Sequence, residues 1–179
     1  MTQLSLFEIG ILEWFQSIHN PICDLIAKFL NIAAAHGEIF IILSLILLAY
    51  KPTRKIGLVC GTALLLDLLL VNITVKPLVE RVRPYDLCSA LEIIIKAPHD
   101  FSFPSGHTAV SFAFAAAISP LGKKAHTLAL SFACLMGISR LYLCVHYPTD
   151  VLAGAVMGTA CGIAALFIWK KAFKHDIII

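Results

Sequence analysis

The chain has 179 residues, of which 59% are hydrophobic and only 14% are charged. Soluble domains are about 45–50% apolar and about 25% charged, so this composition excludes a solvated globule and a disordered chain. A membrane span takes about 20 apolar residues. The length therefore predicts one domain over residues 1–179, an all-α integral membrane bundle of about six transmembrane helices. The formal net charge of +3 is too small to indicate a nucleic-acid partner.

The N-terminal segment lacks the Lys/Arg-rich start and the small-residue cleavage site of a signal peptide. Apolar side chains instead recur there at helical spacing: Leu4, Phe7, Ile11, Trp14 or Phe15, and Ile18. Glu8 and Glu13 lie off this stripe. The pattern predicts a helix that lies in the membrane interface, with its apolar side towards the lipid.

Residues 21–50 allow two interpretations. The stretch 21–35 is short and apolar, His36-Gly37-Glu38 interrupts it, and residues 39–50 are strongly apolar. Either there are two short spans joined at His36-Gly37, or residues 29–50 form a single span. We favour two spans, because an ionisable pair in the middle of a membrane is costly.

Four more apolar segments follow along the chain, at residues 56–82, 106–119, 125–145 and 151–169. The longest polar stretch, roughly residues 84–103, separates the first two of them. In the last segment Gly154, Gly158 and Gly162 recur every four residues. This small-xxx-small pattern favours close helix packing, which we expect within the bundle rather than between subunits.

Basic residues mark one side of the predicted bundle. Eight of them fall on three turns or ends that alternate with the other connections: Lys51, Arg54, Lys55, Lys123, Lys124, Lys170, Lys171 and Lys174. By the positive-inside rule this side faces the cytoplasm. The 84–103 loop and the 146–149 turn then lie together on the opposite side.

Two further features concern a pair of cysteines and an acidic residue within a predicted span. Cys88 and Cys144 lie near span ends and are candidates for a disulfide, although spacing alone does not show one. Asp67 lies within a span, where we expect a hydrogen bond to a neighbour such as Asn72.

The outer side collects an unusual set of polar residues. Lys76 and Arg83 are seven residues apart, two turns along one helix face. Three helix ends bring the others to the same surface: Ser105, Gly106, His107, Arg140, His146 and Asp150. His99 and Asp100 lie in the outer loop, where a solvated position is favoured over a role in substrate access.

These residue types fit an oxyanion site, above all one for phosphate. Arginines supply bidentate donors and Lys76 a point charge. Ser105-Gly106 opens a helix, where backbone N–H groups and the helix dipole favour an anion. The two histidines add a nucleophile and a proton donor, which binding alone does not need.

Each residue also has an ordinary structural interpretation. Lys76 can pair with Glu80 four residues on, and Ser105 can simply cap its helix. His146 and Asp150 can be a capping pair. Each of these interpretations is reasonable for one residue. Together they require that all of these polar residues fall on the same side of the membrane, at the observed spacings, by chance.

The strings KPLVERVRP (76–84), PSGH (104–107) and SRLYLCVHYPTD (139–150) resemble the three signature motifs of the type 2 phosphatidic acid phosphatase superfamily. In family form these are K-x6-R-P, P-S-G-H and S-R-x5-H-x3-D, and all three match in order over about the middle 75 residues. Soluble haloperoxidases share the motifs, but the apolar spans of this chain argue against that branch.

The resemblance implies a membrane lipid phosphatase that needs no metal and no cofactor. It implies that His146 attacks phosphorus to give a phosphohistidine, that Asp150 supports it, and that His107 protonates the leaving oxygen. The residues that hold the phosphoryl oxygens would be Lys76, Arg83, Ser105, Gly106 and Arg140.

The short length resembles that of small bacterial lipid phosphatases, which implies a multi-pass protein of the cytoplasmic (inner) membrane with an extracytoplasmic active site. Undecaprenyl diphosphate is the favoured substrate, because that carrier is released on the outside. Phosphatidylglycerol phosphate, phosphatidic acid and lipid A phosphates remain alternatives, as does a binder or transporter of anionic lipids without turnover. The expected partners are the lipid phosphate and the bilayer; oligomeric state is open, and a monomer would suffice.

Overall fold

The computed structural model describes residues 3–33 and 37–172, and within these ranges every regular element is helical. The α-helices are α1 (Gln3–Ser17), α2 (Pro21–Ala33), α3 (Glu38–Ala49), α4 (Arg54–Asp67), α5 (Lys76–Val79), α6 (Pro84–Leu87), α7 (Gly106–Ala117), α8 (Lys123–Tyr142) and α9 (Pro148–Ala172). Two 3-10 turns, η1 (Lys51–Thr53) and η3 (Ser119–Leu121), and a π-helix, η2 (Leu68–Val75), complete the order. The predicted all-α class is confirmed, while His36 and Lys174 lie outside the described residues.

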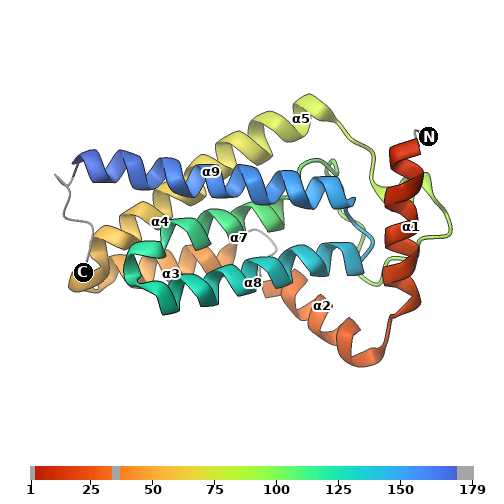
Figure 1. Cartoon of the computed structure of the whole chain (residues 1–179), viewed down its shortest axis with the longest axis horizontal. Coiled ribbons are helices and arrows are strands. Elements are labelled where there is room, and N and C mark those ends of the chain that lie inside the picture. The colour runs from red at the N-terminus through yellow and green to blue at the C-terminus, as the bar shows by residue number, and fades with distance from the viewer. Residues whose placement is uncertain (1–2, 34–36, 173–179) are drawn as a thin grey trace.

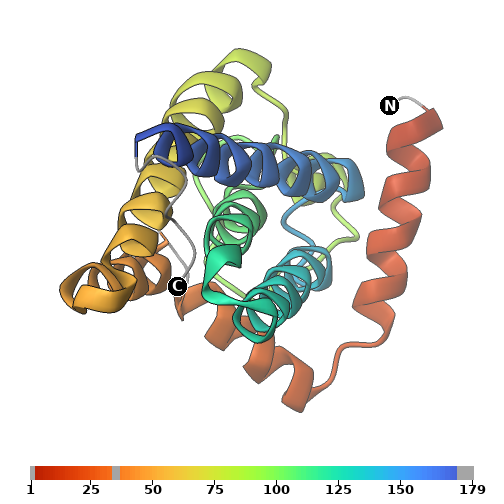
Figure 2. The same cartoon turned by 60° about the vertical axis from the view of Figure 1, so that its left-hand side comes forward.

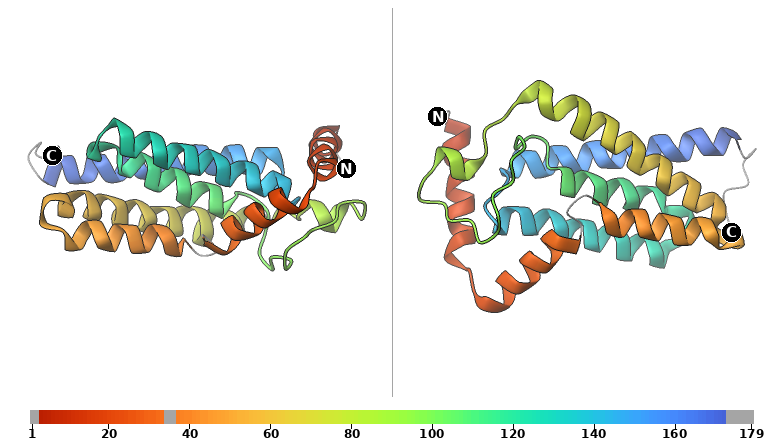
Figure 3. Two further views of the ribbon diagram at one scale, coloured as in Figure 1. Left: turned by 90° about the horizontal axis from the view of Figure 1, so that it is seen from below. Right: turned by 180° about the vertical axis from the view of Figure 1, so that it is seen from behind.

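Helix α7 lies at the centre of the bundle, with α3, α4, α8 and α9 around it (Figures 1 and 2). Figure 3 shows α3 and α4 side by side as a layer beneath α7, α8 and α9. Small side chains such as Ala109, Ala113 and Ala117 are fully buried on α7 and allow its neighbours to approach closely. The apolar core runs from there to Val59 on α4 and Met136 on α8.

Helix α9 packs its three regularly spaced glycines directly against the backbone of α7. A Cβ atom placed on Gly158 would lie 2.0 Å from the carbonyl oxygen of Ala109, and one on Gly154 would lie 2.6 Å from that of Ser105. Gly162 meets Ala113 in the same way, at 2.5 Å. The predicted packing of this stripe within the bundle is confirmed.

Replacing Gly158 with alanine is therefore expected to destabilise the fold, because the methyl group has no space beside the Ala109 carbonyl. Overpacking of this kind typically costs about 1–3 kcal/mol. A thermal unfolding scan in detergent measures it. Gly10→Ala is the matched control, since nothing lies within 4 Å of a Cβ there; equal melting temperatures for both variants would contradict the close contact.

Among residues 3–33 and 37–172, two helical stretches are long and apolar enough to cross a membrane, Lys51–Leu87 and Pro148–Ala172. Helices α2 and α3 have 13 and 12 residues, about 20 and 18 Å at 1.5 Å per residue, against a hydrocarbon core of about 30 Å. The predicted break at Gly37 is present, but neither helix is long enough to cross alone. As a pair bent by 56° they form a third candidate span, so the count of six spans stays a prediction.

The two ends of the bundle differ in charge. The α3–α4 connection, the start of α8 and the end of α9 lie at one end of the molecule, and they carry the predicted basic residues up to Lys171 (Figure 1). The 88–105 loop, the α8–α9 connection and α1 lie at the opposite end. This grouping into two ends follows the sequence prediction.

Helix α1 lies across the second end of the bundle, transverse to the long helices (Figure 1). Leu12 on α1 is buried against Leu91, Cys144 and Tyr147, whereas Phe7 and Trp14 are exposed. Glu8, which lies off the predicted apolar stripe, is buried as well. The helix is thus present as predicted, and its placement in a membrane interface stays a prediction.

Candidate active site

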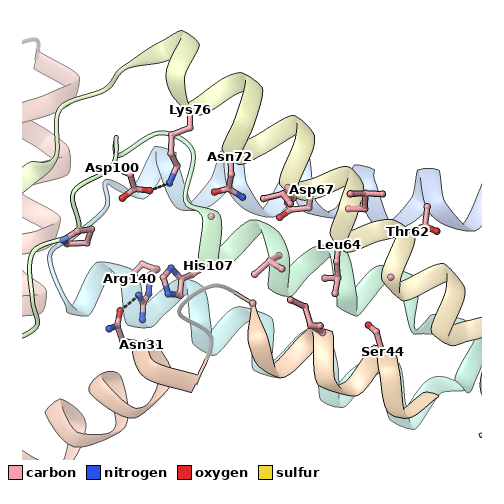
Figure 4. Close-up of a pocket in the computed structure, with 18 of the residues that line it drawn as sticks. Asn31, Ser44, Thr62, Leu64, Asp67, Asn72, Lys76, Asp100, His107 and Arg140 are labelled. Atoms are coloured by element: carbon pink, nitrogen blue, oxygen red, sulfur yellow. Dashed lines mark hydrogen bonds and ion pairs between the residues drawn. The ribbon is translucent and has the colours of Figure 1, made fainter. Parts of the chain in front are cut away.

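A cavity of about 930 Å³ extends from the α1 end of the bundle along the space between α3 and α4. Its inner half is apolar and is lined by leucines of those two helices, such as Leu45 and Leu65. Its other half is polar (Figure 4). Six of the eight predicted site residues line the cavity: Lys76, Arg83, Gly106, His107, Arg140 and His146.

Lys76 and Arg83 are both buried and both bind Asp100 of the 88–105 loop. The predicted shared helix face is wrong, because α5 ends at Val79 and residues 80–83 are not helical. The Lys76 ammonium contacts the Oδ2 atom of Asp100, and Arg83 donates from Nη2 to Oδ1 at 2.7 Å. Arg83 also donates from Nε to the Asp100 carbonyl and from Nη1 to the Val145 carbonyl, at 2.8 and 2.6 Å. The guanidinium is therefore fixed in place.

Asp100 is more than the solvated loop residue that the sequence favoured. Its side chain remains 53% exposed, yet its carboxylate is shared by two buried cations and it lines the cavity. Partial burial raises the pKa of this carboxyl, but Lys76 and Arg83 more than offset that effect and lower the pKa to about 2. Asp100 is thus a permanent anion beside the predicted phosphate-binding cations.

Arg140 faces the same cavity from α8. It is 1% exposed and donates from Nη1 to Oδ1 of Asn31 on α2, at 2.8 Å (Figure 4). The Nε and Nη2 atoms donate to the hydroxyl of Ser139. Asn31 did not stand out in the sequence, and it connects α2 to the site.

The start of α7 supplies His107 and Gly106. The Nε2 atom of His107 is buried and, in the described part of the chain, has no hydrogen-bond partner. A Cβ atom on Gly106 would lie 2.9 Å from Oδ1 of Asn72 and 3.8 Å from Nζ of Lys76. The glycine thus leaves open the space beside the Lys76 ammonium.

Ser105 differs from the other predicted phosphate ligands. It is fully buried, its hydroxyl shares a hydrogen bond with Thr108, and its N–H donates to the carbonyl of Asp150 at 3.1 Å. It is not among the residues that line the cavity. The structure therefore gives Ser105 a role in joining the start of α7 to the start of α9.

His146 and Asp150 form a buried pair at the α8–α9 connection. The Nδ1 atom of His146 lies 3.6 Å from Oδ2 of Asp150, just beyond hydrogen-bonding distance. Burial, with the nearby Arg83, lowers the pKa of His146 to about 4 although Asp150 opposes the shift. The imidazole is therefore neutral near pH 7, as a nucleophile has to be.

Asp150 is itself held on both carboxylate oxygens. Oδ2 accepts hydrogen bonds from Ser102 at 2.5 Å and from the Tyr147 N–H at 2.9 Å. Oδ1 accepts one from Arg81 at 2.6 Å. Neither Ser102 nor Arg81 was predicted; Arg81 lies within the KPLVERVRP string, at a position that the family pattern leaves free.

Two further expectations are decided by the structure. All six cysteines are free, and Cys88 and Cys144 pack in one apolar cluster without a disulfide. Asp67 lines the apolar half of the cavity, and its Oδ1 atom has no hydrogen-bond partner in the described residues. The expected hydrogen bond to Asn72 or a similar neighbour is wrong for that oxygen.

The model of the PAP2 superfamily matches residues 56–174, which include all three motifs. The chain belongs to the PAP2 superfamily. It is 30% identical over 122 residues to a protein named undecaprenyl-diphosphatase from Sulfolobus acidocaldarius, which covers 68% of this chain. The same alignment covers 59% of that relative, so the chain matches about three fifths of its length.

Two crystal structures of PAP2 proteins resemble the whole bundle. LpxE from Aquifex aeolicus superposes with a TM-score of 0.78 at 27% identity, covering 88% of this chain and 93% of that one. A phosphatidylglycerolphosphate phosphatase from Bacillus subtilis gives 0.79 at 24% identity, covering 96% and 88%, and shows the shared fold. The names of these PAP2 relatives differ in the lipid they specify, so the family alone does not select one.

Proposed function

We propose that this PAP2 protein is an integral membrane lipid phosphatase or diphosphatase, with undecaprenyl diphosphate as the first candidate substrate. The observation that carries the proposal is the convergence of two histidines and three cations at the polar end of one cavity whose other half is apolar. All these residues come from one chain, so a monomer suffices. Phosphatidylglycerol phosphate, phosphatidic acid and lipid A phosphates are the alternative substrates.

The proposed reaction has two steps. His146 attacks phosphorus through Nε2 and forms a P–N bond, while the P–O bond to the lipid leaving group breaks and His107 donates a proton to that oxygen. Water then attacks phosphorus, the P–N bond to His146 breaks, His107 accepts the proton of the water, and phosphate leaves. Lys76, Arg83, Arg140 and the open space at Gly106 surround the phosphoryl oxygens, where fixed donors stabilise the developing charge. No step uses a metal.

The apolar half of the cavity supports a lipid rather than a soluble phosphate ester. It continues from the cations between α3 and α4, lined by side chains such as Ile41, Leu58 and Leu68. Burial of apolar chain contributes about 0.8 kcal/mol per CH₂. We therefore place the headgroup at Lys76 and Arg83, and the first part of the lipid chain between α3 and α4.

Phosphate release from a panel of lipids tests this function. Purified protein with a chelator present is assayed on a polyprenyl diphosphate, phosphatidylglycerol phosphate, phosphatidic acid and a lipid A phosphate, and kcat/KM values are compared. If kcat/KM is highest for the polyprenyl diphosphate, the first candidate substrate is supported. If kcat/KM is higher for another lipid, that lipid becomes the proposed substrate. No release from any of them excludes the phosphatase and leaves the anionic-lipid binder.

The proposed location is the bacterial cytoplasmic membrane, with the cavity's polar end on the extracytoplasmic side and α1 in the interface. The basic end of the bundle supports this orientation. Glu92→Cys and Lys124→Cys, each in a background with Cys23, Cys88 and Cys134 replaced by serine, place a thiol at opposite ends of the bundle. An impermeant maleimide applied to intact cells is expected to label only Glu92→Cys; the reverse pattern overturns the orientation.

Asp100→Asn is expected to lower KM for the lipid phosphate and the inhibition constant of inorganic phosphate. The Asp100 carboxylate contacts Lys76 and Arg83, so a substrate phosphate competes with it for the same two cations. An asparagine still accepts a hydrogen bond from Arg83 but carries no charge. The expected change is roughly three- to tenfold, or about 1 kcal/mol.

Steady-state assays with lipid and inhibition by phosphate measure this change. Asp86→Asn is the matched control, because it removes the same charge from an exposed residue in the same region. An unchanged or higher KM for Asp100→Asn, or an equal decrease for both variants, contradicts the competition.

A further inference from the structure

Arg81 is the centre of a second polar network, behind the cations that line the cavity. Its Nη1 atom donates to Oδ1 of Asp150 at 2.6 Å and to the hydroxyl of Thr149 at 2.7 Å. Its Nη2 atom donates to Oε2 of Glu8 at 2.7 Å. The guanidinium lies 3.8 Å from the centre of the Tyr147 ring, so both its edge and its face are occupied.

Glu8 ties the N-terminal helix α1 into this network. The side chain is 2% exposed, and besides Arg81 its carboxylate accepts hydrogen bonds from the N–H and the hydroxyl of Thr149. A buried carboxylate without such partners costs several kcal/mol. Its burial in this arrangement therefore depends on Arg81 and Thr149, and α1 docks where these two residues are.

The network acts on the orientation of Asp150. Arg81 holds Oδ1, so the other oxygen, Oδ2, is turned to Ser102, the Tyr147 N–H and the Nδ1 side of His146. Without Arg81 the carboxylate loses the hydrogen bond to Oδ1, and only the two hydrogen bonds to Oδ2 still orient it. Hydrogen-bond partners that orient metal ligands in this way typically change activity by about 10–100-fold when removed, and we expect an effect of the same order here.

We propose that Glu8 and Arg81 are positioning residues: Glu8 on α1 holds Arg81, and Arg81 holds the Asp150 carboxylate in the orientation that faces His146. The N-terminal helix thus completes the catalytic site from outside the three motifs. This inference rests on the proposed function, in which Asp150 supports His146 as the nucleophile.

Glu8→Gln and Arg81→Lys are the test variants, with Glu13→Gln as the control on an exposed position of the same helix. Glutamine keeps an acceptor for Thr149 but removes the ion pair, and lysine keeps the charge but not the two-sided donor geometry. We expect kcat to fall roughly 10–100-fold in both, with KM within about threefold of wild type and Glu13→Gln unchanged. A role in folding alone predicts instead a lower melting temperature with wild-type kcat for the folded fraction.

A double-mutant cycle tests whether Glu8 acts through Arg81. In an Arg81→Met background, Glu8→Gln is expected to change kcat by less than about twofold, since the two act in series. Independent, multiplying losses overturn the relay. If the Arg81 variants fold poorly, Glu8→Gln in the wild-type background still reports the loss of kcat on its own.

Assays of His146→Ala and Asp150→Asn beside these variants separate the two hypotheses. If both lose activity while Glu8→Gln and Arg81→Lys keep wild-type kcat, the positioning inference is wrong and the proposed mechanism stands. If His146→Ala and Asp150→Asn remain active, the mechanism fails and the inference fails with it.

Discussion

His146→Ala is expected to lower kcat/KM for the lipid phosphate on the order of 10³-fold or more, the usual loss on removing a nucleophile. The neutral imidazole lies at the polar end of the cavity beside Arg83, and no other described histidine combines a cavity position with an aspartate partner behind it. Phosphate release by the purified variant measures the loss. His126→Gln, at the basic end of the bundle, is the control, because His126 contacts the Ala115 carbonyl and does not line the cavity.

The same variant decides between turnover and binding. Wild-type protein quenched at short times with radiolabelled substrate is expected to carry an acid-labile phosphate, and His146→Ala to carry none. A binder without turnover never forms this bond. Full activity of His146→Ala, or labelling that persists in it, would refute the proposed nucleophile.

His107→Ala is the second variant with a large expected effect, about 10²- to 10⁴-fold for a lipid monoester, the range for general acid catalysis. The buried Nε2 atom of His107 has no protein partner in the described residues, so it is available to the leaving oxygen. An alkoxide leaving group needs that proton. A leaving group that is stable as an anion, such as an aryloxide or the phosphate released from a diphosphate, needs it less.

The dependence on leaving group therefore identifies the role. We expect the His107→Ala defect to shrink by at least tenfold when an aryl phosphate replaces the lipid monoester, and to be intermediate with a diphosphate. The control is Lys76→Ala, whose defect should be similar for all three because the phosphoryl oxygens are the same. If His107→Ala lowers activity by the same factor for all three leaving groups, the residue acts in substrate binding and not as the proton donor.

The sequence was sufficient to predict the helical class and six motif residues that the structure brings together in one cavity. Apolar segments of membrane length dictate helices, and the three motifs place their polar residues at helix ends, which the bundle brings to one end. Helix breaks such as Gly37 were also predictable, whereas the length of each helix was not. The regular spacing of glycines from Gly154 to Gly162 correctly indicated that another helix packs closely against this face of α9, because a surface without side chains is needed only where a neighbour approaches closely.

The supporting residues were not predictable for a physical reason. Arg83 and Asp100 are separated by 17 residues, and Arg81 lies 73 residues from Glu8. Helical periodicity does not predict such pairs. Their contacts depend on the course of the mostly irregular segment between α5 and α7 and on the position at which α1 docks. For Ser105 the sequence motif indicated a role that packing changes. The motif marked this residue as a phosphate ligand, but the packing of α7 against α9 places it in contact with the Asp150 carbonyl.

The contact between α7 and α9 also has a consequence for lipid specificity, because the proposed reacting residues and the apolar part of the cavity belong to different helices. Gly154 lets the backbone at Ser105 lie directly against α9. The proposed proton donor at the start of α7 and the proposed nucleophile just before α9 are therefore spaced by a backbone contact that no change of side-chain rotamer can adjust. The apolar walls of the cavity, which we propose to contact the lipid chain, belong mainly to α3 and α4. Substitutions that retune which lipid is accepted are thus to be sought on α3 and α4, where they leave the reacting groups undisturbed.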